Sequence, residues 1–198
     1  MKVGIVNYQA SNMGSLESAL NQLEVDFLIC ETPEEISKSD LVILPGVGSF
    51  SSGIQNIRNS GMEDSILSHV RTERPLIGIC LGMHLLATVG FEGGETMGLN
   101  LIHGEIKKLE SGQTLRTPHM GWDFIQDSSG SSYAYFAHSY YFDLIASAEI
   151  ELVSTYIWGD DEYPAHIRFN NVSGIQYHPE KSGKKGLETL AFELERFK

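Results

Sequence analysis

The sequence predicts an α/β fold in which a doubly wound, mainly parallel sheet has flanking helices and appended antiparallel strands. Strand-like and helix-like segments alternate through the first ninety residues, and the strand-like ones are short apolar runs such as 41–44, as expected for strands covered on both faces. After Gly90 this alternation gives way to short β-like pieces between turns. The 198 residues contain no linker-like stretch, so we expect a single domain spanning 1–198.

The first half of the chain contains the predicted parallel strands. The helix after the first strand has Leu16, Leu20 and Leu23 at helical spacing, and Thr32 followed by Pro33 is typical of the start of the next helix. The predicted strands lie at 2–7, 25–30, 41–44 and 76–79, and further helices at 54–58 and 62–70.

The second half contains the predicted antiparallel strands. They lie at 104–109, 124–125, 133–142, 150–157, 165–169 and 172–177, after a glycine-rich acidic loop at 90–98. Asn170-Asn171 is a suitable hairpin turn between the last two strands. Leu187, Leu190 and Leu194 share one face of a final amphipathic helix over 184–198.

The composition excludes several classes of partner. A formal net charge of −12 disfavours nucleic acid and anionic membranes, which attract basic surfaces. No apolar run reaches the length of a membrane span, and the N-terminus lacks a signal-peptide pattern. The two cysteines, Cys30 and Cys80, form no CxxC pair, so we expect a cytoplasmic protein.

A strand, a sharp glycine turn and a helix meet at Gly78-Ile79-Cys80-Leu81-Gly82. This is the pattern of a nucleophile elbow with cysteine as the nucleophile. The N-terminus of the following helix would favour a thiolate. The alternative is that Cys80 is an ordinary buried core cysteine.

A base for this thiol is predicted at His178, which follows a strand and precedes Pro179. Proline favours extended backbone at the preceding residue, and residues two apart in extended chain face the same side. Glu180 should therefore orient the His178 imidazole. Zinc ligation by Cys80, His178 and Glu180 is an alternative, but no closely spaced ligand pair supports a metal site.

A second glycine turn, Pro45-Gly46-Val47-Gly48, directly follows the strand at 41–44. Glycines let backbone amides approach a ligand closely, although an ordinary strand-to-helix turn has the same composition. In open α/β sheets, ligands bind at the carboxyl ends of strands, where both glycine turns are predicted to lie.

Taken together, the motifs resemble those of class I (triad) glutamine amidotransferases, and the resemblance covers essentially the whole chain. The matching stretches are 45–48, 78–82 and 176–182, in the family's order. Pro118–Trp122 and Tyr135–Tyr140 are most similar to the glutaminase subunits of imidazole glycerol phosphate synthase.

The resemblance implies hydrolysis of L-glutamine to glutamate and ammonia, without a cofactor. Cys80 would attack the carboxamide, His178 would transfer protons, and Glu180 would orient His178. By the same analogy the oxyanion would be held by the backbone N–H groups of Val47 and Leu81. The glutamine would contact Gly48, His84, Ser139 and Tyr140.

The resemblance also implies a heterodimer with a (β/α)8-barrel cyclase that receives the ammonia through a tunnel. The barrel would make imidazole glycerol phosphate and an aminoimidazole carboxamide ribonucleotide in histidine biosynthesis. The predicted interface residues are Asn12, His119, Met120, Trp122 and Lys181.

Several positions depart from the family's pattern. His84 replaces the usual glutamine, and Asp123 replaces the usual asparagine after Trp122. These departures leave open a paralogous subunit that supplies ammonia to a sugar-modifying amidotransferase in surface-polysaccharide synthesis. A non-catalytic binding or regulatory relative and a peptidase or hydrolase with a similar elbow are alternatives of other classes.

Overall fold

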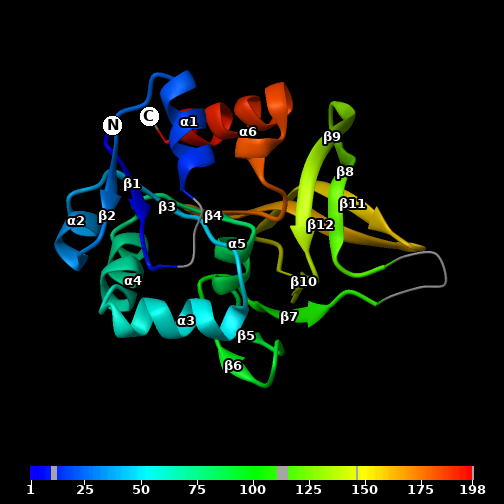
Figure 1. The fold of residues 1–198 in the computed structure, drawn as a ribbon, viewed down its shortest axis with the longest axis horizontal. Coiled ribbons are helices and arrows are strands. Elements are labelled where there is room, and N and C mark those ends of the chain that lie inside the picture. Colours follow the sequence, from blue (N-terminus) through cyan, green and yellow to red (C-terminus); the bar gives the residue numbers. More distant parts are fainter. Residues whose placement is uncertain (10–12, 111–115, 146, 198) are drawn as a thin grey trace.

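The computed structural model describes residues 1–9, 13–110, 116–145 and 147–197. Its main feature is a nine-stranded sheet in the order β2-β1-β3-β4-β13-β12-β11-β8-β9 (Figure 1). The first five strands in this order are mutually parallel, and the remaining four continue the sheet in antiparallel fashion. The predicted fold class is confirmed.

The parallel strands are short and buried on both faces for the most part. They are β1 (Val3–Val6), β2 (Phe27–Cys30), β3 (Leu41–Leu44), β4 (Leu76–Ile79) and β13 (Val172–Ile175). Continuous apolar runs suit this position because helices cover both sides of the sheet.

Three of the four antiparallel strands of this sheet, β8, β11 and β12, are longer than the sequence pattern predicted. The four strands are β8 (His119–Asp127), β9 (Gly130–His138), β11 (Ile150–Trp158) and β12 (Asp161–Phe169). In β8, Met120, Trp122 and Phe124 face solvent, whereas His119 and Ile125 are buried. Such alternation is expected where one face of a sheet is open to water.

A second, four-stranded sheet has the order β10-β7-β5-β6. Its strands are β5 (Val89–Gly90), β6 (Thr96–Met97), β7 (Gly104–Lys108) and β10 (Tyr140–Leu144). The prediction of one strand over 133–142 is wrong, because the chain leaves the large sheet at Ser139 and enters the small one. The apolar alternation continues through this crossing and hides it.

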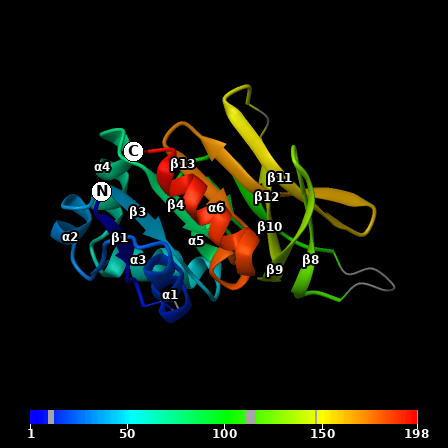
Figure 2. The same cartoon turned by 90° about the horizontal axis from the view of Figure 1, so that it is seen from above.

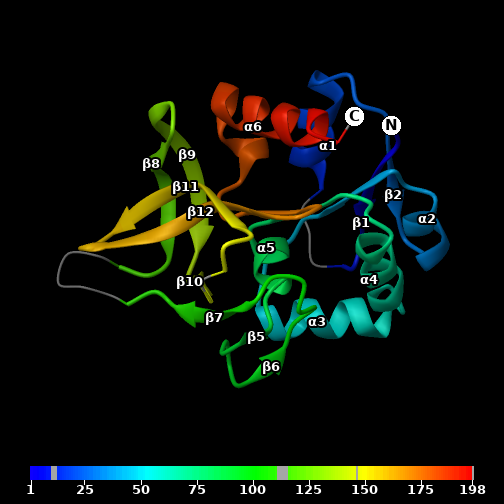
Figure 3. The ribbon, with the colours of Figure 1, turned by 180° about the vertical axis from the view of Figure 1, so that it is seen from behind.

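Helices form a layer on each side of the large sheet. On one side lie α1 (Gly14–Gln22) and α6 (Gly183–Glu195), which pack over the buried residues Ile5 and Ile175 (Figures 1 and 2). The opposite side is covered by α3 and α5 with the small sheet (Figure 3). The remaining helices are α2 (Pro33–Ser37), α3 (Phe50–Asn59), α4 (Glu63–Arg71), α5 (Leu81–Leu85) and the 3₁₀ turn η1 (Pro179–Lys181). None of the helices in the described ranges is both long and apolar enough to cross a membrane.

Candidate active site

Two neighbouring parallel strands bring the predicted nucleophile and base to one edge of the sheet. β4 and β13 pair in register, with Ile79 opposite Ile175. Cys80 directly follows β4, and its backbone N–H donates to the Ile175 carbonyl at 2.7 Å. His178 lies three residues after the end of β13. The fold therefore brings together two motifs that are almost a hundred residues apart in the sequence.

The elbow at Cys80 has a strained backbone. Cys80 has φ 53° and ψ −109°, a conformation that is costly for a residue with a side chain. Glycine is needed at position 82 because a Cβ there would lie 1.7 Å from the Leu44 carbonyl oxygen of β3. α5 begins at Leu81 and has only five residues, so its contribution to a positive field is confined to a few first-turn N–H groups.

Glu180, the predicted orienter, contacts the imidazole of His178. His178 Nδ1 lies 2.8 Å from Glu180 Oε1, and both side chains are buried. Because the carboxylate accepts, Nδ1 bears a proton and Nε2 is the basic nitrogen. Nε2 is buried without a hydrogen-bonding partner among the described residues.

The pKa of His178 depends on its interaction with Cys80. Burial alone would lower the pKa of His178, but Cys80 and Glu180 outweigh burial and raise it to about 10. The Cys80 sulfur makes a long contact of 3.9 Å to the Ala137 carbonyl of β9. The thiol and the imidazole thus interact as a pair.

The glycine turn after β3 lies beside this pair and is anchored by Tyr8. The Tyr8 hydroxyl donates to the Pro45 carbonyl at 2.6 Å, and burial, with Cys80 nearby, raises the pKa of Tyr8. Val47 and Gly48 are exposed, and Gly48 has φ +117°. Leu81, the other predicted oxyanion residue, is buried at the start of α5.

His84, on α5, is buried and faces the strand that leads to His178. Its Nε2 lies 2.7 Å from the side-chain oxygen of Gln176. Burial lowers the pKa of His84 to about 4, so the ring is neutral and donates from Nε2 to that oxygen. The predicted glutamine contact at this position stays a prediction.

Ser139 and Tyr140 lie where the chain passes from β9 to β10, and a carboxylate that the sequence reasoning missed lies near Tyr140. Glu92 accepts the backbone N–H of Phe50 at 2.7 Å, at the start of α3. Burial raises the pKa of Tyr140, and Glu92 contributes to that rise. Glu92 stands in a glycine-rich loop with no recognisable spacing to the other motifs, so only the fold reveals its position.

The predicted interface residues lie on and beside β8. Met120 and Trp122 are 65% and 57% exposed, and Trp122 packs edge-on against Tyr135. Lys181 lies over the same Tyr135 ring, 6.0 Å from its centroid. His119 points to the other side of β8 and is buried. Asn12 lies outside the described residues.

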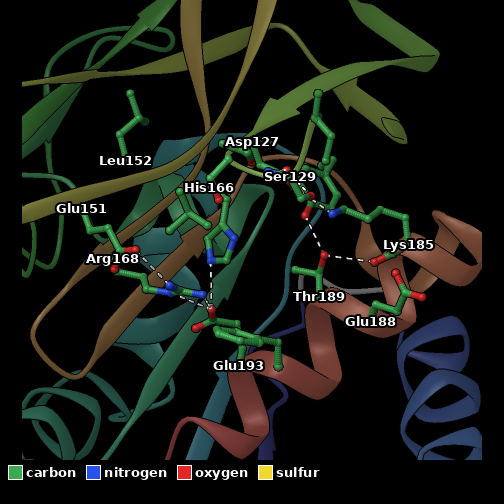
Figure 4. Close-up of a pocket in the computed structure, with 16 residues that line it drawn as sticks. Asp127, Ser129, Glu151, Leu152, His166, Arg168, Lys185, Glu188, Thr189 and Glu193 are labelled. Atoms are coloured by element: carbon green, nitrogen blue, oxygen red, sulfur yellow. Dashed lines mark hydrogen bonds and ion pairs between the residues drawn. The ribbon is translucent and has the colours of Figure 1, made fainter. Parts of the chain in front are cut away.

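A pocket of about 540 Å³ lies elsewhere, between the antiparallel strands and α6 (Figure 4). Its charges are paired with one another: Arg168 bonds Glu193 at 2.5 Å, and Lys185 bonds Asp127 at 2.7 Å. Burial disfavours the Glu193 carboxylate, but hydrogen bonds from His166, Ser173 and Arg168 hold its pKa at about 2. These pairs fix α6 to the sheet and lack the free nucleophile and base found at Cys80.

Comparisons with known proteins agree with the geometry. The family model described as glutamine amidotransferase class-I matches residues 4–195. The imidazole glycerol phosphate synthase subunit HisH of Bacillus subtilis is 37% identical and covers 95% of this chain and 93% of its own length. Subunit HisH 2 of Methanococcus maripaludis is 35% identical, with 95% and 96% covered.

Solved structures show the same fold at lower identity. A crystal structure described as glutamine amidotransferase superposes with a TM-score of 0.77 at 21% identity, covering 97% of each chain. The structure of PurLQS from Thermotoga maritima gives 0.75 at 18% identity, with 100% and 99% covered.

Proposed function

This chain belongs to the class I glutamine amidotransferases, and we propose that it is the glutaminase subunit of an imidazole glycerol phosphate synthase. The observation that best supports the reaction is the arrangement of His178, whose Nδ1 is held by Glu180 while Cys80 interacts with the same buried ring and raises its pKa. The names of relatives that match 95% of the chain support the pathway, which is histidine biosynthesis. We assign the whole chain to one catalytic domain in the cytoplasm.

In this mechanism Cys80 attacks the side-chain carboxamide of L-glutamine. His178 takes the thiol proton and gives it to the leaving nitrogen, so ammonia departs and a glutamyl thioester remains on Cys80. Water, activated by the same imidazole, then hydrolyses the thioester to glutamate. Glu180 keeps the imidazole in the required tautomer and stabilises its charged form.

The tetrahedral intermediate needs donors for its oxyanion. We assign them to the backbone N–H groups of Leu81, which follows the nucleophile, and Val47, in the glycine turn. Removing one such donor typically costs about 10²–10³ in rate. The Tyr8 anchor at Pro45 supports this role, because it fixes one end of the turn while Gly48 leaves the other end adjustable.

The glutamine would lie between the elbow and the crossing from β9 to β10. Ser139, Tyr140, Gly48 and His84 are the predicted contacts, and we add Glu92. A carboxylate beside Tyr140 suits the α-ammonium group of an amino acid, because buried or half-buried charges require an opposite charge.

The ammonia acceptor would be a cyclase subunit of the (β/α)8-barrel type. Ammonia released into water at neutral pH becomes protonated and loses its nucleophilicity, so the reaction favours docking on the acceptor. The exposed side chains of Met120 and Trp122 support the solvent-facing side of β8 as the docking surface, with Lys181 and Asn12 assigned to it by family analogy. The barrel would form imidazole glycerol phosphate and the aminoimidazole carboxamide ribonucleotide.

The test is covalent labelling and product formation in the complex with the histidine-pathway cyclase. A diazo-ketone analogue of glutamine should label Cys80, and Cys80→Ala should abolish glutamine-dependent product while ammonia-dependent product remains. Failure to label in that complex would refute the enzyme assignment. Labelling with a sugar-modifying synthase as the only productive partner would instead identify the paralogous ammonia supplier.

A further inference from the structure

Two histidines lie opposite each other on β8 and β9, the strands that connect the predicted docking surface to the active site. His119 begins β8, His138 ends β9, and they are directly opposite in the antiparallel ladder. His119 Nδ1 lies 3.2 Å from His138 Nε2, and both side chains are at least 94% buried. Neither ring has a step in the mechanism proposed above.

The outer nitrogens of the pair are bound to acceptors. His119 Nε2 lies 2.9 Å from Asp123 Oδ2, whose other oxygen accepts the Phe124 N–H at 2.7 Å. His138 Nδ1 lies 2.8 Å from the Tyr140 carbonyl oxygen. An ionised carboxylate and a carbonyl can only accept, so each of these two ring nitrogens has a proton.

The number of protons between the two inner ring nitrogens then decides whether these nitrogens repel or attract each other. If both rings were neutral, His119 Nδ1 and His138 Nε2 would face each other with two lone pairs at 3.2 Å. One additional proton turns this repulsion into an N–H···N hydrogen bond. With it, the two rings hold a single positive charge that the Asp123 carboxylate balances, so the three groups together are neutral.

We propose that Asp123, His119 and His138 form a proton-bridged chain that clamps β8 to β9 and positions the segment from Ala137 to Tyr140 for glutamine. The positioning part rests on the function proposed above, in which Ser139 and Tyr140 contact the substrate. In this role Asp123, His119 and His138 are positioning residues and touch no reacting atom.

β9 is well placed to transmit such a clamp to the catalytic pair. The Ala137 carbonyl contacts the Cys80 sulfur at 3.9 Å, and the Tyr135 carbonyl accepts the His178 backbone N–H at 2.8 Å. A shift at the end of β9 therefore moves groups that touch both the nucleophile and the base.

Asp123 reaches His119 because β8 is bent. Residues four apart in a straight strand are separated by about 13 Å along its axis, too far for this contact. Gly121, midway between them, has φ +119°, a conformation that residues with a side chain rarely adopt.

The surroundings set the direction of the pH dependence. The titratable groups that face the pair are Asp123 on β8, Tyr156 on β11, His84 on α5 and His178 after β13. Burial lowers the pKa of both rings, Asp123 opposes this at His119, and the neighbouring histidines lower the pKa of His138 further. Burial raises the pKa of Tyr156, so that group stays neutral. The bridging proton is thus lost as the pH rises.

Asp123→Asn separates this proposal from a purely structural role. An amide can donate as well as accept, so its N–H can bond His119 Nε2 and leave the ring proton on Nδ1, which then donates to His138 Nε2. The chain becomes fully bonded with both rings neutral, and the pH-sensitive proton is no longer required. Asp160→Asn, in an exposed turn, removes the same charge away from the pair.

The first measurement is nitrogen–nitrogen scalar coupling across the bridge in the full chain labelled with ¹⁵N-histidine. As the pH rises toward the ordinary histidine pKa of about 6.5, the wild type and Asp160→Asn should lose the coupling, because the pKa of both rings is lowered, whereas Asp123→Asn should retain it. Absence of coupling in the wild type at every pH, or the same pH dependence in Asp123→Asn, would overturn the bridge.

The second measurement is glutamine hydrolysis in the complex with the cyclase over the same pH range. The wild-type KM should rise about fivefold relative to Asp123→Asn as the bridge opens, with little change in kcat. An unchanged KM would overturn the positioning role even if the bridge exists. A wild-type complex without glutaminase activity would refute both the proposed function and the positioning role, while the coupling still decides the bridge.

Discussion

Glu180 Oε1 accepts a 2.8 Å hydrogen bond from His178 Nδ1, and this contact joins the proposed orienting carboxylate to the proposed base inside a buried site. We predict that Glu180→Gln lowers kcat by about 10²–10⁴, because the amide keeps the shape but removes the charge that stabilises the imidazolium. Stopped assays of glutamate release in the complex would measure this. Glu188→Gln, at an exposed position of α6, is the matched control and should change kcat by less than about twofold. A loss of similar size in both variants would contradict the assignment.

The raised pKa of His178 predicts a stability that declines toward alkaline pH. The folded-state pKa is about 10, above the ordinary histidine value of about 6.5. The protonated ring therefore stabilises the fold fully below about pH 6.5, and this contribution is lost as the pH rises toward 10. Cys80→Ala removes a principal cause of the shift. Urea unfolding at pH 6 and pH 9 should show a smaller loss in Cys80→Ala than in the wild type, and equal losses would disprove the pairing.

Some features of the site were predictable because they depend on local chain geometry. Gly78–Gly82 encodes the elbow and His178–Glu180 encodes the orienter, since each set of residues interacts within a few positions of the sequence. The parallel strands were predictable for the same reason, as each is a short apolar run between a turn and a helix. Fold class and reaction class follow from these segments.

Other features depend on contacts between distant segments, which no local pattern encodes. Glu92 binds Phe50 from a glycine-rich loop, 42 positions away, and His119 meets His138 only because β8 and β9 pair in that register. The sequence places His119 beside Met120 in the predicted interface, but the two side chains point to opposite faces of β8. The sequence pattern predicts strand only over 124–125, so it does not separate the two faces at 119 and 120.

Gly82 gives a prediction about the elbow itself. A methyl group at this position would meet the Leu44 carbonyl at 1.7 Å, so β3 and α5 would have to separate. We expect Gly82→Ala to lower the free energy of unfolding by more than about 3 kcal/mol and to abolish glutaminase activity. Gly93→Ala is the comparison, because Gly93 has open space and only its φ of +74° opposes a side chain. That variant should lose only about 1–2 kcal/mol, and equal losses would show that contact with Leu44 is not the cause.

Trp122 gives a prediction about docking. Its side chain is 57% exposed and packs edge-on against Tyr135, so it is a suitable anchor for a partner pocket. Trp122→Ala should weaken binding to the barrel cyclase by at least about 2 kcal/mol, or roughly thirtyfold in Kd. Tyr133 lies on β9, closer to the β8–β9 turn, and is similarly exposed. Tyr133→Ala should change Kd less in the same calorimetric titration. A larger effect at Tyr133 would move the interface toward the β8–β9 turn.

His84 gives a prediction about both acid stability and substrate binding. Its pKa of about 4 lies below the unfolded value of about 6.5, so the fold favours the neutral ring and loses stability as the pH falls from 6.5 toward 4. His84→Gln can keep the 2.7 Å bond to the Gln176 oxygen without a titrating group. The free energy of unfolding of the variant minus that of the wild type should therefore be larger at pH 5 than at pH 7, by on the order of 1–2 kcal/mol. Because the amide also offers an acceptor, the KM for glutamine should fall in the same variant. Unchanged KM together with the stability gain would place His84 in the support of Gln176 and remove it from the glutamine site.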